Sequence, residues 1–285
     1  MRPPSLLLPS LLLSTLLITT GLSTATQAAQ GVSLANGFTD FTTWSHFGSA
    51  VSFNQTPGNG FTYSDLELTQ PGQGGSAGAG FAPTTLTLDF DLPFSFDFHF
   101  YIPVHNGLRG DGLTFTLATA PGVGSGGSGL GYQGLGAASV ADAIDTFHFS
   151  GDPVSPSLQI LQAGNVSPLA ATETGLGDAI RDPNFQWYAR VDYLPSGLGD
   201  QAGQLSGRIE HLNLGNFSVS ANVDFAALGL VGNPVYYGFT GANGLADDGH
   251  FVTSAVPVPE PGQWVLLGAG LAAIALMARR RRRQP

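Results

Sequence analysis

Apolar and polar residues alternate with a period of two over much of the interior of the chain. Residues 94–100 place Phe94, Phe96, Phe98 and Phe100 on one side, as a strand with one face against a core requires. The same alternation predicts strands over residues 113–117, 185–194, 205–211 and 217–225. Residues 235–239 are more continuously apolar, which predicts a strand in the interior of a sheet.

Turn-forming stretches separate these runs, and the longest covers residues 121–136. With 40 Gly and 19 Pro in the chain, short strands and tight turns are favoured over long helices. No short internal repeat is present, which argues against a propeller or a solenoid. The pattern therefore predicts an all-β fold, a sandwich of two antiparallel sheets.

The first 28 residues have the features of a secretory signal peptide. Arg2 gives a positive start, residues 6–17 are mainly apolar, and Thr26-Gln27-Ala28 offers small side chains at a cleavage site. The apolar run is shorter than the roughly 20 residues that span a bilayer. We therefore expect cleavage after Ala28 and export of the rest; the alternative is a retained anchor.

The C-terminal residues 257–285 form a second exported-protein signal. Residues 258–262 read Val-Pro-Glu-Pro-Gly, the apolar segment 264–278 follows, and five arginines occupy residues 279–283. The segment predicts a transmembrane helix, and the arginines should keep its C-terminal end in the cytoplasm. An ordinary single-span tail anchor is the alternative.

This order of features resembles the PEP-CTERM sorting signal, with Val258, Pro259, Glu260 and Pro261 as the motif residues. The resemblance implies processing by an exosortase-type membrane protease, with a cut between Pro259 and Gly262. It also implies a bacterium that makes exopolysaccharide, and a protein at the cell envelope, the cell surface or in the extracellular matrix.

The charge of the intervening domain limits its partners. The chain has no cysteine and no lysine, and between the two ends four arginines face nineteen acidic residues, a net charge of −15. Such a surface repels phosphate backbones, so nucleic acid is excluded as a partner. Neutral sugars or cations suit it better.

A series of short blocks occurs in the order found in legume-type (L-type) lectins. The blocks lie at residues 66–69, 72–77, 94–100, 110–117, 126–132, 144–147, 152–153, 187–193, 228–229, 237–244 and at His250. Residues 29–256 thus resemble an L-type lectin domain, which implies a concanavalin-like jelly-roll sandwich that binds a polysaccharide or another glycan.

The resemblance implies a shallow sugar pocket. Asp111 matches the carboxylate that accepts hydrogen bonds from two sugar hydroxyls, and Ser128 or Gly129 matches the backbone N–H donor. Residues 241–248 match the loop that shapes specificity. His148 is a further candidate donor, or simply an exposed loop histidine. Aromatic stacking is expected from Phe149, Phe147 or Tyr132. The alternative for Asp111 is that it opens a tight turn.

The metal site of the family is only partly matched. Asp145 and Asp152 match two aspartates, and the carbonyl of Phe147 matches a backbone ligand. Ala143, Ser157 and Phe149 stand where the family has Glu, His and Asn. A transition metal is therefore improbable. A weak calcium site at Asp145 and Asp152, with Asp142 as an additional ligand, is the remaining expectation; otherwise both aspartates cap turns.

No catalytic motif is present. Glycosidases need two carboxylates about 5–9.5 Å apart, and Glu67, Glu173 and Glu210 stand apart from any such motif. The sequence therefore predicts a non-catalytic, envelope-sorted carbohydrate-binding protein. The alternative is a structural matrix or adhesion protein that keeps the sandwich and has lost sugar and metal binding.

Overall fold

The computed structural model describes residues 30–56, 61–105, 107–181 and 186–257. The predicted signal peptide, the sorting residues Val258 to Pro261 and the predicted transmembrane helix all lie outside these ranges. Within the described ranges, no helix has the length and apolarity needed to cross a membrane.

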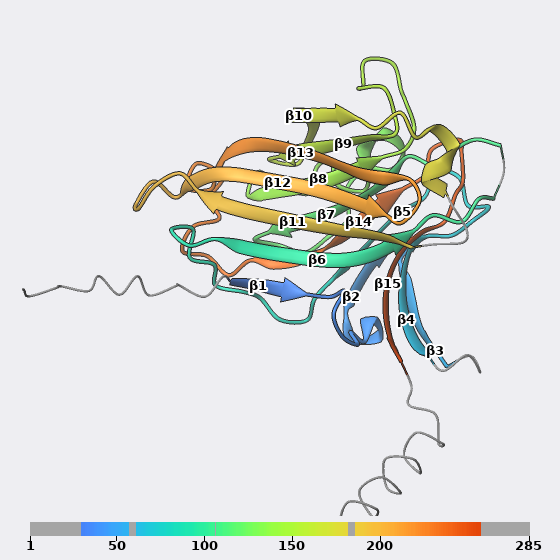
Figure 1. Ribbon diagram of the computed structural model, residues 1–285, viewed down its shortest axis with the longest axis horizontal. Helices are drawn as coiled ribbons and strands as arrows, with labels where there is room; N and C mark the ends of the chain where they lie inside the picture. The colour runs from blue at the N-terminus through green and yellow to red at the C-terminus, as the bar shows by residue number, and fades with distance from the viewer. Residues whose placement is uncertain (1–29, 57–60, 106, 182–185, 258–285) are drawn as a thin grey trace, which may run out of the picture.

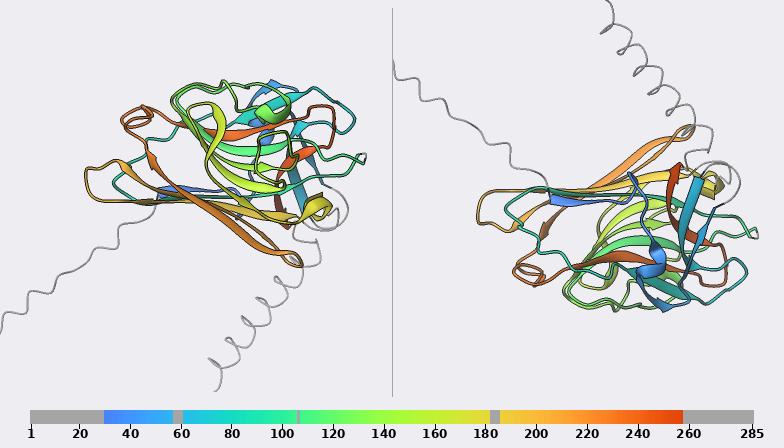
Figure 2. Two further views of the ribbon diagram at one scale, coloured as in Figure 1. Left: turned by 90° about the horizontal axis from the view of Figure 1, so that it is seen from above. Right: turned by 90° about the horizontal axis from the view of Figure 1, so that it is seen from below.

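Two sheets form the molecule, as predicted (Figure 1, Figure 2). The eight-stranded sheet has the order β13 (Gly215–Asp224), β12 (Ala202–His211), β11 (Trp187–Pro195), β6 (Phe94–Tyr101), β15 (His250–Pro257), β4 (Phe61–Thr69), β3 (Val51–Gln55), with β1 (Gln30–Ser33) also on β6. The seven-stranded sheet has the order β10 (Asn165–Glu173), β9 (Ser157–Gln162), β8 (Ser139–Asp145), β7 (Gly112–Ala118), β14 (Tyr236–Ala242), β5 (Ala77–Phe81), β2 (Ser45–Gly48).

Pairing is antiparallel throughout these sheets, except that β1 pairs with β6 in parallel. Three short 3-10 helices complete the described chain: η1 (Phe41–Thr43), η2 (Gly127–Gly129) and η3 (Gly177–Arg181). The continuously apolar run at 235–239 falls in β14, which lies inside its sheet between β7 and β5, as predicted.

The core lies between the sheets and is lined by the alternating phenylalanines of β6. Phe96 contacts Phe115 of β7 at 4.8 Å between ring centroids, and Phe98 contacts Phe239 of β14 at 4.8 Å. All four phenylalanines of this run are at most 1% exposed. Their period-two spacing therefore places one face of β6 against the opposite sheet.

A second, smaller cluster covers the outer face of β8. Leu130 and Tyr132, from the glycine-rich segment, pack against Ala141, Ala143 and Leu161. Tyr132 is 0% exposed, and its hydroxyl lies 3.0 Å from Ser139 Oγ. The expectation that Tyr132 stacks on a ligand is therefore wrong, because its ring anchors this loop to the sheet.

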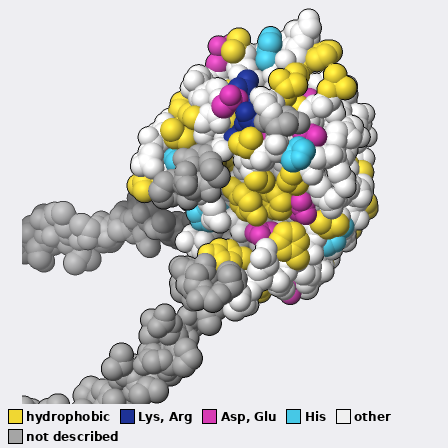
Figure 3. Space-filling view, turned by 90° about the vertical axis from the view of Figure 1, so that its right-hand side faces the viewer, with side chains coloured by type: hydrophobic (Ala, Val, Ile, Leu, Met, Phe, Trp, Pro, Cys, Tyr) yellow, Lys and Arg dark blue, Asp and Glu magenta, His cyan; other side chains and the backbone are white. Residues whose placement is uncertain are grey.

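Basic side chains are rare on the surface. On the face shown in Figure 3 they gather in one cluster, with acidic side chains beside them and a hydrophobic patch below.

Candidate functional site

The candidate site forms where β7 begins and where β8 and β14 end. The first residue of β7, Gly112, is in register with Asp145 of β8 on one side and with Ala242 of β14 on the other. Asp111, immediately before β7, therefore lies between the segment after β8 and the loop after β14.

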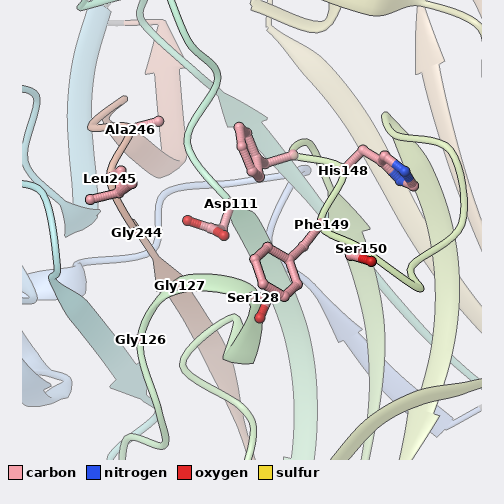
Figure 4. Close-up of a pocket in the computed structure, with 11 residues that line it drawn as sticks. Asp111, Gly126, Gly127, Ser128, His148, Phe149, Ser150, Gly244, Leu245 and Ala246 are labelled. Carbon is pink, nitrogen blue, oxygen red and sulfur yellow. The ribbon is translucent and has the colours of Figure 1, made fainter.

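Eleven residues line a cleft of about 490 Å³ at this position (Figure 4). They are Asp111, Gly126, Gly127, Ser128, Phe147, His148, Phe149, Ser150, Gly244, Leu245 and Ala246. The sequence-predicted residues Asp111, Ser128, His148 and Phe149 are thus brought together, from three segments far apart in the chain.

Asp111 is the one carboxylate among the described lining residues, and it is only 5% exposed. Its pKa is raised to about 6, chiefly by burial and to a smaller extent by the nearby charge of Asp152. Backbone hydrogen bonds from Gly244 and from Asp111 itself act in the opposite direction and lower the pKa. The group is therefore an ionised acceptor at neutral pH and titrates at mildly acidic pH.

Two glycines lie close to the carboxylate of Asp111, which is itself only 5% exposed. A Cβ at Gly244 would lie 3.1 Å from Asp111 Oδ2, and a Cβ at Gly127 would lie 3.7 Å from Gly244 Cα. Gly127 has φ of +61°, where side chains are strained. Its N–H donates to the Asn243 carbonyl at 3.2 Å, which joins the two loops above Asp111.

Of the two candidate N–H donors, Ser128 lines the cleft and Gly129 does not. Gly129 is buried behind the lining, and its N–H donates to the Gly126 carbonyl at 3.2 Å. A Cβ at Gly129 would lie 2.9 Å from the Ser125 side chain. Gly129 therefore supports the loop rather than facing the cleft.

The segment after β8 supplies the apolar wall of the cleft. Phe149 is 57% exposed and lies beside Ser128, whereas His148 points away from Asp111 (Figure 4). His148 Nδ1 lies 3.1 Å from the Pro153 carbonyl, so Nδ1 carries the proton. Leu245, on the opposite side, is fully exposed. This placement matches the interpretation of His148 as an exposed loop residue.

At the predicted metal site, the carboxylate of Asp145 is engaged by protein donors. Asp145 accepts hydrogen bonds from Ser155 Oγ at 3.0 Å, Gln159 Nε2 at 2.8 Å and the Phe147 N–H at 3.1 Å. Burial, followed by the charge of Asp152, raises its pKa to about 7. Within the described ranges, no group of three or more His, Asp or Glu side chains is arranged to hold a metal ion. Calcium takes 6–8 oxygen ligands, and these residues fit it poorly.

Asp142 is wrong as an additional calcium ligand. It lies on the opposite face of β8 from Asp145, between the sheets, where it is 1% exposed. A Cβ at Gly207 of β12 would collide with its carboxylate. Its place in the strand, three residues before Asp145, puts the two side chains on opposite faces.

Sequence reasoning missed several residues of the site. Ser150 lies outside every segment that the sequence singled out, whereas Gly126, Gly127, Leu245 and Ala246 fall in the predicted glycine-rich and specificity loops without having been named singly. Arg109 and Arg181 lie beside the cleft, and their rarity in an acidic domain was the signal that could have drawn attention to them.

Comparisons with known proteins support two parts of this description. The PEP-CTERM protein-sorting motif model matches residues 257–283. Among curated proteins, no sequence matches the chain.

Similar solved structures are lectins of legume plants. Lectin I-B4 from Griffonia simplicifolia, in a metal-free form, is 20% identical over 75% of this chain and 93% of its own, with a TM-score of 0.56. The Bauhinia forficata lectin, solved with GalNAc, is 21% identical over 74% of this chain and 100% of its own, with a TM-score of 0.55.

Arcelin-5, a lectin-like defense protein from Phaseolus vulgaris, is 20% identical over 77% of this chain and 93% of its own, with a TM-score of 0.58. At such identities the likeness establishes the fold. The chain therefore combines a sandwich of the legume-lectin fold with a PEP-CTERM protein-sorting motif at residues 257–283.

Proposed function

We propose that this chain is an exported, non-catalytic carbohydrate-binding protein that holds a neutral glycan over Asp111. The observation that carries the proposal is the position of one ionised, nearly buried carboxylate at the base of a cleft with apolar walls. Ligand sites typically combine such apolar walls with a few fixed polar groups.

The chemistry of the cleft favours a sugar. A carboxylate can accept hydrogen bonds from two neighbouring hydroxyls, and charge-assisted bonds of this kind are stronger than neutral ones. Phe149 and Leu245 offer exposed apolar surface to the C–H face of a pyranose. No arginine or lysine is among the described lining residues, so an anionic sugar would meet Asp111 without a compensating charge.

The number of carboxylates in the cleft argues against hydrolysis. A glycosidase places two carboxylates about 5–9.5 Å apart on either side of the scissile bond. The described lining of this cleft offers Asp111 alone. Binding without chemistry is therefore the function that this site supports best.

The sorting motif supports a location for this activity. A PEP-CTERM motif indicates export and association with the cell surface or membrane. We expect an exosortase-type protease as the processing partner, with cleavage between Pro259 and Gly262, and membrane attachment through residues 264–278 until that cut is made. An exopolysaccharide or another extracellular glycan would then be the ligand within reach.

A glycan array tests the proposal. The full-length chain, kept in mild detergent because of its apolar segment 264–278, should bind a defined set of neutral glycans, and Asp111→Asn should lose that signal. Asp192→Asn, on the outer face of β11, is the matched control and should bind as the unchanged chain does. A signal that survives Asp111→Asn would contradict the proposed site.

A structural matrix or adhesion role is the second candidate. It is favoured by Asp145, whose oxygens are engaged by Ser155, Gln159 and the Phe147 N–H in place of a metal ion. A folded chain that binds no glycan on the array would support this role over carbohydrate binding.

A further inference from the structure

Two of the four arginines in the domain, Arg109 and Arg181, lie beside the cleft. Arg109 contacts both ends of the segment that carries Phe147 and Phe149. Arg109 Nε donates to the Thr146 carbonyl at 2.6 Å, and its Nη2 lies 3.5 Å from the Ser155 carbonyl. These two residues bracket the segment that carries Phe147 and Phe149. A single guanidinium therefore holds the start and the end of that segment.

Arg109 continues into a chain of ion pairs. Asp178 Oδ1 accepts from Arg109 Nη1 at 3.0 Å and from Arg181 Nη2 at 2.9 Å. Arg181, at the end of η3, donates from Nη1 to both carboxylate oxygens of Asp248 at 3.3 Å. Arg181 is 4% exposed and Asp248 is 0% exposed, so this part of the network is shielded from water and salt.

Asp248 carries the network to the remaining walls of the cleft. Its Oδ2 accepts from the N–H of Gly110, the residue before Asp111, at 3.0 Å. Its own carbonyl accepts from Asn243 Nδ2 at 2.8 Å, and the Asn243 carbonyl accepts from the Gly127 N–H at 3.2 Å. Hydrogen bonds and ion pairs therefore connect four segments around the cleft: the segment after β8, the Asp111 turn, the loop after β14 and the glycine-rich loop.

The network occupies the role that a metal ion performs in a loop-built site. A metal ion positions loops by gathering their carboxylate and carbonyl oxygens around one positive charge. Here the Thr146 carbonyl faces a guanidinium, and Asp145 is engaged by three protein donors. Asp145 and the Thr146 carbonyl therefore have few oxygen lone pairs left for calcium, and a guanidinium already supplies positive charge beside them.

We propose that the Arg109–Asp178–Arg181–Asp248 network, and not a bound calcium ion, holds the cleft loops in place, so that ligand binding here is independent of divalent cations. The second half of this statement rests on the proposed carbohydrate-binding function; the first half does not. Arg109 acts as a positioning residue, because it contacts the loop backbone and does not line the cleft.

Calcium titration of the full-length chain is the first test. The chain should give no saturable heat with calcium, and its melting temperature should be the same in calcium and in a chelator, because a ligand that binds only the folded state raises that temperature. Saturable calcium binding that Asp145→Asn removes would overturn the proposal.

Hydrogen exchange of Arg109→Gln is the second test, and it needs no known glycan. The Arg109 side chain is 22% exposed, so the variant should fold. Exchange should accelerate at amides of residues 146–155 in Arg109→Gln and not in Arg190→Gln, which removes the same charge from an ion pair on β11. Arg109→Lys keeps the charge but lacks the planar fork, and should give an intermediate rate.

Unchanged exchange at residues 146–155 in Arg109→Gln would overturn the positioning role. If the array also yields a glycan, its affinity should fall about tenfold or more in Arg109→Gln, with no recovery on adding calcium. A recovery with calcium would contradict the proposal. An array without any glycan signal would remove the proposed function and leave the exchange and titration results to decide the network.

Discussion

Arg181 and Asp248 form an ion pair whose two side chains are almost completely removed from water, with Nη1 of Arg181 3.3 Å from both carboxylate oxygens. Two backbone N–H groups, those of His105 and Gly110, also donate to the carboxylate of Asp248. A buried pair of this kind repays its desolvation only when further hydrogen bonds satisfy both groups. Asp248 meets that condition. Its two backbone donors belong to the segment that leads to Asp111.

Removing one partner of this pair should be costly. We expect Arg181→Met to reduce the free energy of unfolding by about 3–5 kcal/mol, because Asp248 would remain buried without its counter-charge. The double variant Arg181→Met with Asp248→Leu should recover part of the loss. Denaturant unfolding of the three chains measures these differences, and a single variant as stable as the unchanged chain would show that the pair is dispensable.

Binding should depend on pH through Asp111. Its carboxylate accepts hydroxyl hydrogen bonds only when ionised, and burial holds its pKa at about 6. Affinity should therefore be constant above pH 7 and fall about tenfold by pH 5. Protonation of Asp111 should lower the affinity without unfolding the chain. A pKa raised above the unfolded value stabilises the folded chain at low pH, and that contribution disappears as the pH rises through about 6.

Titration calorimetry from pH 8 to pH 5, with a melting curve at each pH, checks this prediction. Asp111→Asn provides the control, because its weak residual binding should show no such inflection. An affinity that stays flat across the range, or that falls only where the chain unfolds, would count against Asp111 as the acceptor.

A methyl group at Gly244 should block the cleft without unfolding the chain. Its Cβ would lie 3.1 Å from Asp111 Oδ2, and Gly244 lines the same cleft. We expect Gly244→Ala to lower affinity by about tenfold and to change stability by less than about 1 kcal/mol. Gly107→Ala is the matched control, because a Cβ there meets nothing within 4 Å. Equal affinities of the two variants would place the ligand elsewhere.

The buried carboxylate of Asp142 should lower the stability of the sandwich. Its carboxylate is 1% exposed between the sheets, and neither oxygen has a hydrogen-bond partner among the described residues. Burying an unpartnered polar group costs about 1–3 kcal/mol, so Asp142→Ala should raise the melting temperature by several degrees. Burial also raises the pKa of Asp142 well above its ordinary value.

The gain from Asp142→Ala should depend on pH in a definite direction. A raised pKa means that the stability contributed by the protonated group is lost as the pH rises through its folded value. The difference in melting temperature between the two chains should therefore widen toward alkaline pH. Asp142→Asn, which keeps a polar group and cannot ionise, should remove the pH dependence. A lower melting temperature for Asp142→Ala would show that the carboxyl contributes favourable packing.

The strands β6, β7 and β14 were predictable from their apolar patterns, and β8 was not. The phenylalanines of β6 alternate because only one of its faces meets the opposite sheet. In β8 every residue is buried, since Leu130 and Tyr132 cover its outer face, and the sequence there shows no alternation. Asp142 within that strand also suggests an exposed turn, and the tertiary structure overrides this preference.

The residues that line the cleft were partly predictable from the sequence. The ion pairs behind them were not. Asp111 and Ser128 belong to blocks whose order resembles a known family, so their proximity could be expected. Arg109 and Asp178 are 69 positions apart, and Arg181 and Asp248 are 67 apart. No local pattern connects such pairs, because sheet topology alone brings them together.

Mapping amide chemical shifts with the strongest array glycan tests the proposed site most directly. Shifts should concentrate at Asp111, Gly127, Ser128 and residues 244–246, and Asp111→Asn should abolish them at the same glycan concentration. A second hollow of the described surface lies between β10, β12 and β13 and is lined by Thr172, Ser206 and Ser220. Shifts that concentrate there, with residues 126–128 and 244–246 unmoved, would contradict binding over Asp111.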